Sequence, residues 1–97
     1  MRYYVPDKIL REIAAFARKN GVKKVILFGS RARGTHRERS DIDIAVSGGD
    51  FQTFYDDVKE KTHTLLMFDI VDLDAGISEK LQQEIERDGV VIYGEAG

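Results

Sequence analysis

The chain has 97 residues, 42% of them hydrophobic, which predicts one domain over residues 1–97 and leaves no room for separate substrate-binding or regulatory domains. Fifteen basic and seventeen acidic residues give a net charge of -2, which argues against non-specific binding of nucleic-acid backbones as the main role. The absence of cysteine excludes disulfides and thiolate metal sites. With no signal-like or membrane-length apolar run, we expect a cytoplasmic protein.

The first half of the chain predicts a helix, a buried strand and a second, acidic strand. Apolar residues at helical spacing predict a helix over residues 6–19, which Asn20-Gly21 ends. The apolar run at 25–28 is typical of a strand covered on both faces, and Gly29-Ser30 closes it. A short helical turn and an exposed loop follow at 31–39. The next strand, 41–46, alternates strictly between polar and apolar positions.

The second half predicts two helices, each followed by a strand. Asp50 is the expected N-cap of a helix ending near residue 62, and a strand follows over residues 65–73. Ser78 caps a helix with Leu81 and Ile85 facing inward, and Gly89 ends it before a strand at 90–93 and a frayed tail at 94–97. This order predicts an α/β fold: a mixed sheet of about four strands with helices packed over it.

Two aspartates stand where a buried strand would normally carry valine. Asp41, Asp43 and Ala45 share one face of the strand at 41–46, because side chains alternate along a strand. Two carboxylates held so close repel each other unless a cation lies between them. Magnesium prefers oxygen ligands and is often bound by one or two carboxylates together with substrate phosphates. The pair therefore predicts a metal site for phosphoryl chemistry.

The residues before the aspartates have the properties that a triphosphate requires. Gly29 lets the backbone approach phosphate oxygens, and Ser30 adds a hydroxyl donor at a helix start. Arg31 and Arg33 either contact the same anion or are solvated loop residues. Ser40 completes the candidate nucleotide-binding residues. A third carboxylate is expected on the strand at 65–73: the candidate in mid-strand is Asp69, and the alternative on the opposite face is Asp72.

The segments "GSRARG", "SDIDIAV" and "FDIVD" together resemble the signature of the DNA polymerase beta nucleotidyltransferase superfamily. More closely, nearly the whole chain is similar to the minimal nucleotidyltransferases, or MNT proteins. The resemblance implies that Asp41, Asp43 and Asp69 hold two Mg²⁺ ions, with Asp69 the expected base. It also implies that Gly29 and Ser30 bind the phosphates of an NTP.

The resemblance further suggests a biological role. Many MNT proteins are encoded beside a helical HEPN protein as an antitoxin and its RNase toxin. It then implies transfer of AMP from ATP to a hydroxyl of that partner. No nucleic-acid template is expected, because the chain has no domains to hold one. Two alternatives stay open: a catalytically silent module that masks its partner by occupancy, and a transferase acting on a small molecule.

Overall fold

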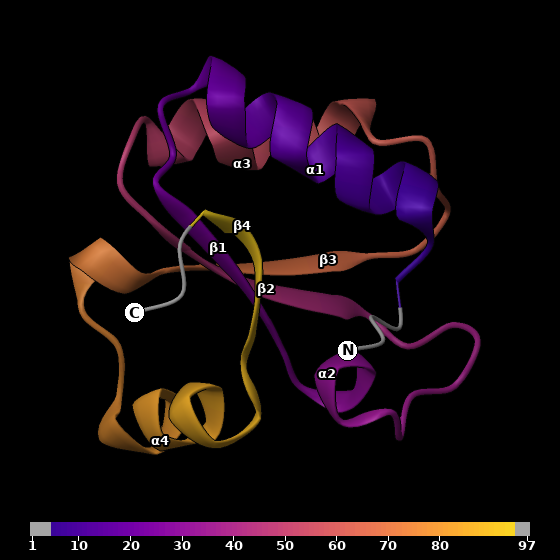
Figure 1. The fold of residues 1–97 in the computed structure, drawn as a ribbon, viewed down its shortest axis with the longest axis vertical. Coiled ribbons are helices and arrows are strands. Elements are labelled where there is room, and N and C mark those ends of the chain that lie inside the picture. The colour runs from indigo at the N-terminus through magenta and orange to yellow at the C-terminus, as the bar shows by residue number, and fades with distance from the viewer. Residues whose placement is uncertain (1–4, 95–97) are drawn as a thin grey trace.

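The computed structural model describes residues 5–94 and shows a four-stranded sheet (Figure 1). The sheet order is β3-β2-β1-β4. The parallel pair is β2 with β3, and β1 runs antiparallel to both of its neighbours. The predicted mixed sheet is therefore confirmed. The strands are β1 (Lys24–Phe28), β2 (Ile42–Ser47), β3 (Phe68–Asp72) and β4 (Val90–Gly94).

Helices lie on both sides of this sheet. In Figure 1, α1 and α3 lie together above the sheet, while α2 and α4 lie below it. Within residues 5–94, no helix is both long and apolar enough to cross a bilayer. The helices are α1 (Asp7–Lys19), α2 (Ser30–Arg33), α3 (Phe51–Lys61) and α4 (Glu79–Asp88), and a 3-10 turn, η1 (Leu73–Ala75), follows β3.

The core is divided between the two faces of the sheet. The larger cluster joins α1 and α3 to alternate residues of the strands, among them Leu27, Ile42 and Ile44. The smaller cluster, built on Phe28, Ala45 and Ile85, lies under α4. Ala45 is the buried residue of β2 in this cluster, so it marks the edge of the covered part of that face. Asp43, one step before Ala45 on the same face, lies at that boundary.

A buried carboxylate ties the two helices of the larger layer together. The side chain of Asp57 accepts hydrogen bonds from Asn20 Nδ2 at 3.0 Å and from Lys19 Nζ at 3.3 Å, and it pairs with Lys61 Nζ at 3.0 Å. The bond from Asn20, followed by those from the lysines, lowers the pKa of Asp57 from 3.8 to about 2. This polar cluster lies on α1 and α3, away from the acidic strand, and its role is structural.

The third strand is shorter than the apolar pattern predicts. It begins at Phe68 instead of residue 65, because the segment before it bends: Leu66 N donates to the Thr64 hydroxyl at 3.1 Å. The preceding Leu65 is fully exposed at 101%, and Met67 is 64% exposed. At the other end, Gly94 belongs to β4 and not to a tail, and the rest of the expected tail, 95–97, lies outside the described residues.

Candidate active site

The turn after β1 brings the backbone directly against the acidic strand. Gly29 has φ 73 and ψ -157, a conformation that only glycine adopts readily. A Cβ placed on Gly29 would overlap the Asp43 Oδ2 atom. The glycine therefore gives the chain its turn into α2, and it also leaves the space that the Asp43 carboxylate fills. Ser30 follows as the first residue of α2.

The structure brings the predicted third carboxylate beside the pair. In the parallel ladder of β2 and β3, Asp43 is the register partner of Asp69, so both side chains lie on the same face of the sheet. Asp41 stands just before β2, which begins at Ile42, and is exposed. Its position is fixed by the next residue, because Ile42 N donates to Met67 O at 2.9 Å.

The electrostatics of Asp43 reflect this crowding. Burial, followed by the charges of Asp69, Asp41 and Glu84, raises the pKa of the Asp43 carboxyl from 3.8 to about 6, while Arg33 opposes the rise. Neighbouring anions destabilise the charged form of a carboxylate, and a cation that binds between them stabilises it. The unfavourable charge arrangement is thus of the kind expected at a metal or catalytic site.

These donors suit magnesium, but they do not form a finished site. Among residues 5–94, no three His, Cys, Asp or Glu side chains converge closely enough to hold a metal ion. Magnesium commonly takes one or two carboxylates and completes its shell with water and substrate phosphates. The half-buried Asp43 and its two acidic neighbours match that pattern, with the remaining ligands to come from a bound triphosphate.

Asp72, the alternative candidate for the third carboxylate, has a structural role. The Asp72 side chain accepts a hydrogen bond from Asp74 N at 3.0 Å and so caps η1. Asp74 in turn accepts from Gly48 N at 2.7 Å and from Ser47 Oγ at 3.2 Å. Together these bonds tie the ends of β2 and β3 to each other. Asp69 is thus the carboxylate paired with Asp43, whereas Asp72 holds the far end of the strands.

Arg31 is buried and holds the loop in front of the aspartates. Only 4% of it is exposed, and its guanidinium donates from Nε to Ser40 O and from Nη2 to Glu38 O, each at 3.0 Å. Ser40 closes a turn with Arg37, whose N donates to the Ser40 hydroxyl at 2.8 Å. The structure therefore excludes a solvated Arg31. It places Ser40 in the framework of the loop, and the phosphate-binding roles of both residues stay predictions.

Arg33 connects the site to the last helix. Its Nη1 lies 3.4 Å from Asp88 Oδ2 and 3.7 Å from Glu84 Oε1 on α4. Sequence reasoning missed both of these acids as neighbours of the site. Their spacing from the inward-facing Leu81 and Ile85 was the available signal, because residues three and four apart share a helix edge. The contact joins α2 to α4, and Glu84 of α4 also helps to raise the pKa of Asp43.

Replacing Gly29 by alanine is expected to destabilise the protein by at least about 3 kcal/mol, because it adds both backbone strain and the overlap with Asp43. Gly76→Ala is the matched control: Gly76 has φ +87, but nothing lies within 4 Å of an added Cβ. The control should lose only about 1 to 2 kcal/mol from strain. Urea unfolding of both variants measures the difference, and equal losses would exclude the close approach of Gly29 to Asp43.

Comparison with known proteins agrees with this geometry. A protein of Methanocaldococcus jannaschii named "Putative protein adenylyltransferase MJ0435" is 42% identical over 55 residues, which are 57% of this chain and 59% of that protein. The match thus spans less than two thirds of that relative. The fold is also similar to the "toxin-antitoxin with AMP-PNP", with a TM-score of 0.70, 29% identity and coverage of 89% of this chain and 73% of that one.

A second solved structure, described as a "putative minimal nucleotidyltransferase", has a TM-score of 0.64 and 27% identity, and covers 84% of this chain and 86% of that one. The family described as "Polymerase beta, Nucleotidyltransferase" matches residues 11–96, nearly the whole chain. That match includes the Gly-Ser turn and all three aspartates. The chain belongs to the polymerase beta nucleotidyltransferase family.

Proposed function

We propose that the protein transfers a nucleoside monophosphate, AMP from ATP, to a hydroxyl group of a partner protein. The observation that carries this proposal is the register of the central strands. Gly29 and Ser30 follow β1, Asp43 lies on β2, and Asp69 is its direct partner on β3. A phosphate-binding turn, a metal-binding carboxylate and a further carboxylate thus follow one another across the sheet.

The proposed reaction is a substitution at the α-phosphorus of the nucleotide. The acceptor hydroxyl oxygen forms a bond to that phosphorus, the bond to the bridging oxygen of the β-phosphate breaks, and pyrophosphate leaves with the bonding electrons. The hydroxyl proton passes to a base within hydrogen-bond reach, and Asp69 is the carboxylate assigned to that role. The turn at Gly29 and Ser30 holds the leaving phosphates through backbone and hydroxyl donors.

Two Mg²⁺ ions are proposed to bind here, held by Asp41, Asp43 and Asp69. The bound metal supplies positive charge to the attacking and leaving oxygens. Asp43 is the central ligand in this proposal, since the space left by Gly29 receives its carboxylate and both other aspartates raise its pKa.

A partner protein is proposed as the acceptor on the basis of the relatives. One relative is named "Putative protein adenylyltransferase MJ0435", and a structural neighbour at 29% identity is described as a toxin-antitoxin with AMP-PNP. In this proposal the chain acts as the antitoxin and a HEPN-type toxin is the acceptor, in the cytoplasm. A masking module that works by occupancy would need no nucleotide.

The first test is calorimetric binding of a non-hydrolysable ATP analogue with and without Mg²⁺. The wild type should bind only with the metal, and Asp41→Asn/Asp43→Asn should lose binding. The control Asp56→Asn removes one carboxylate charge from the exposed side of α3 and should bind as the wild type does. Metal-independent binding, or binding that survives the double substitution, would contradict the proposed site.

Replacing Asp69 by asparagine is expected to lower turnover at least about a hundredfold, because a general base contributes roughly that factor or more. Binding of the Mg²⁺-bound analogue should stay detectable, since Asp41 and Asp43 remain. Asp72→Asn is the matched comparison, and it should keep turnover while weakening the cap of η1. Release of labelled pyrophosphate measures both variants. Full turnover in Asp69→Asn with a loss in Asp72→Asn would reverse the assignment.

A further inference from the structure

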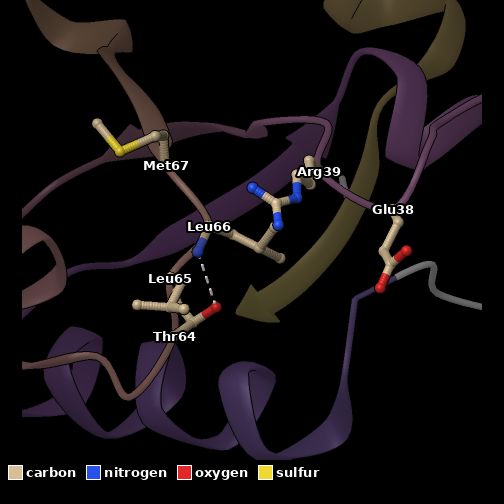
Figure 2. Close-up of a pocket in the computed structure, with 6 residues that line it drawn as sticks. All are labelled: Glu38, Arg39, Thr64, Leu65, Leu66 and Met67. Atoms are coloured by element: carbon tan, nitrogen blue, oxygen red, sulfur yellow. Dashed lines mark hydrogen bonds between the residues drawn. The ribbon is translucent and has the colours of Figure 1, made fainter.

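A surface pocket lies where the segments before β2 and β3 meet, beside the acidic strands. It has a volume of about 580 Å³. Figure 2 shows that two segments form it: the loop before β2, which supplies Arg39 and Glu38, and the segment before β3. The residues from the latter segment are Thr64, Leu65, Leu66 and Met67.

The exposure of this pocket is unusual within the molecule. Leu65 and Met67 are the exposed large hydrophobic residues in the described part of the chain. Large apolar side chains in open contact with water at one place are typical of a surface that another molecule covers. Half of the lining residues are apolar (Leu65, Leu66 and Met67) and half are polar or charged (Glu38, Arg39 and Thr64). The exposed apolar pair, Leu65 and Met67, suits an apolar side chain better than a highly hydroxylated small molecule.

The ladder of β2 and β3 connects this pocket to the carboxylates. Ile42 N donates to Met67 O, so Met67 stands beside Asp41 just as Asp69 stands beside Asp43. Met67 is two residues before Asp69, and residues two apart on an extended segment share a face, with a spacing of about 7 Å. The apolar side chain of Met67 and the carboxylate of Asp69 therefore form one strip at the start of β3.

The geometry of the proposed reaction indicates which substrate approaches this strip. Across the sheet, the turn of Gly29 and Ser30 ends β1, Asp43 lies on β2, and Asp69 and Met67 lie on or beside β3 at the sheet edge. An in-line substitution requires the acceptor oxygen to approach opposite the leaving pyrophosphate. With the phosphates at the β1 end, the acceptor arrives from the β3 side, across Leu65 and Met67.

We infer that Leu65 and Met67 form the docking surface for a protein acceptor, which inserts an apolar side chain close to its reacting hydroxyl. This inference rests on the proposed nucleotidyl transfer and specifies its acceptor. In an extended peptide, a side chain two residues from the acceptor residue lies about 7 Å from it, the same spacing as Met67 from Asp69. A polypeptide with a leucine near its tyrosine, serine or threonine matches the strip.

The test uses immobilised synthetic peptides, each with one central tyrosine, serine or threonine flanked by either leucines or aspartates. They are incubated with α-labelled ATP, Mg²⁺ and the full chain. The wild type should label a leucine-flanked series about tenfold more than its aspartate-flanked counterpart, since one well-packed apolar side chain supplies at least that factor. Leu65→Ser/Met67→Ser and Leu65→Glu should remove this preference.

Two controls separate docking from the nucleotide site. Gln52→Glu adds the same charge as Leu65→Glu at the exposed start of α3, away from the segment before β3, and should keep the preference. Calorimetry with the Mg²⁺-bound ATP analogue should give wild-type affinity for every variant. Because Leu65 is fully exposed, its substitution leaves the core intact.

Each other outcome overturns a defined statement. Equal labelling of both peptide series, no labelling by a wild type that binds nucleotide, or an unchanged preference in the Leu65 and Met67 variants overturns the docking surface and leaves nucleotide binding standing. If the Leu65 and Met67 variants lose nucleotide affinity, these residues belong to the nucleotide site and the docking surface is overturned. Self-labelling of the chain in place of the peptides overturns it in favour of a second copy. A wild type that binds no nucleotide overturns the proposed function itself.

Discussion

Asp43→Asn is expected to make the protein more stable in the absence of metal while abolishing nucleotidyl transfer. The carboxylate is half-buried among other acids, and its pKa is raised to about 6. A shift of about two units corresponds to roughly 3 kcal/mol, and partial exposure to water reduces this to about 1 to 2 kcal/mol. Asparagine has nearly the same shape and no charge, so the variant should unfold about 5 to 10 °C higher at pH 7.5.

The pH dependence of this difference has a defined sign. Between about pH 4 and pH 6 the folded wild type retains the Asp43 proton that the unfolded chain has released, because the folded pKa is the higher one. The contribution of protonated Asp43 to stability is therefore complete below pH 4 and is lost as the pH rises through 6. The Asp43→Asn variant has no carboxyl group there to deprotonate, so it does not lose this stability as the pH rises. The variant and the wild type should therefore have similar stability near pH 4 and diverge above it.

Thermal unfolding at a series of pH values measures this divergence, with Asp56→Asn as the control of equal charge. The control should stay within about 0.5 kcal/mol of the wild type at every pH. Mg²⁺ with the ATP analogue should then reverse the order, since it stabilises the wild type and has no complete site in Asp43→Asn. A metal-free Asp43→Asn that is less stable than wild type at pH 7.5 would contradict the crowded carboxylate cluster.

Sequence reasoning located the fold and the acidic cluster because both depend on regular patterns. Strict alternation over 41–46 predicted which face of the strand would carry Asp43, and the structure confirms that Asp43 and Ala45 share it. The same reasoning placed Asp69 on the neighbouring strand, and the ladder makes it the direct partner of Asp43. Periodicity is sufficient for such placements because a one-residue shift would turn every apolar side chain of the strand towards water.

The features that sequence reasoning missed depend on local bonds or on tertiary contact. The apolar residues at 65–67 predicted that this segment belongs to a strand. The hydrogen bond from Leu66 N to the Thr64 hydroxyl instead bends the segment and exposes Leu65. The spacing of apolar residues in the sequence does not predict such a hydrogen bond. Likewise, the burial of Arg31 depends on how the loop folds back over it, and the approach of Glu84 to Asp43 depends on where α4 lies.

Arg31→Ala is the second substitution with a large expected effect, because it removes the group that organises the loop before β2. Two charge-assisted hydrogen bonds to the carbonyls of Ser40 and Glu38 are lost in a buried place, which costs about 2 to 4 kcal/mol. Arg31→Lys should recover little, since an ammonium cannot reproduce the fork that reaches both carbonyls. Arg33→Ala is the control: its ion pairs are partly exposed and worth about 1 kcal/mol or less.

The loss should be local as well as global, because one of the two bonds of Arg31 holds Ser40, the residue directly before Asp41. Ser40 N donates to Arg37 O at 3.1 Å, so hydrogen exchange at the Ser40 amide reports on the loop itself. In Arg31→Ala this amide should exchange at least about tenfold faster, while the protected amides of α1 change only as far as global stability falls. If instead stability and Ser40 protection were unchanged and only nucleotide affinity fell, Arg31 would act on the phosphates and not on the loop. Urea unfolding, exchange at Ser40 and calorimetry on the same variant therefore decide between the two roles.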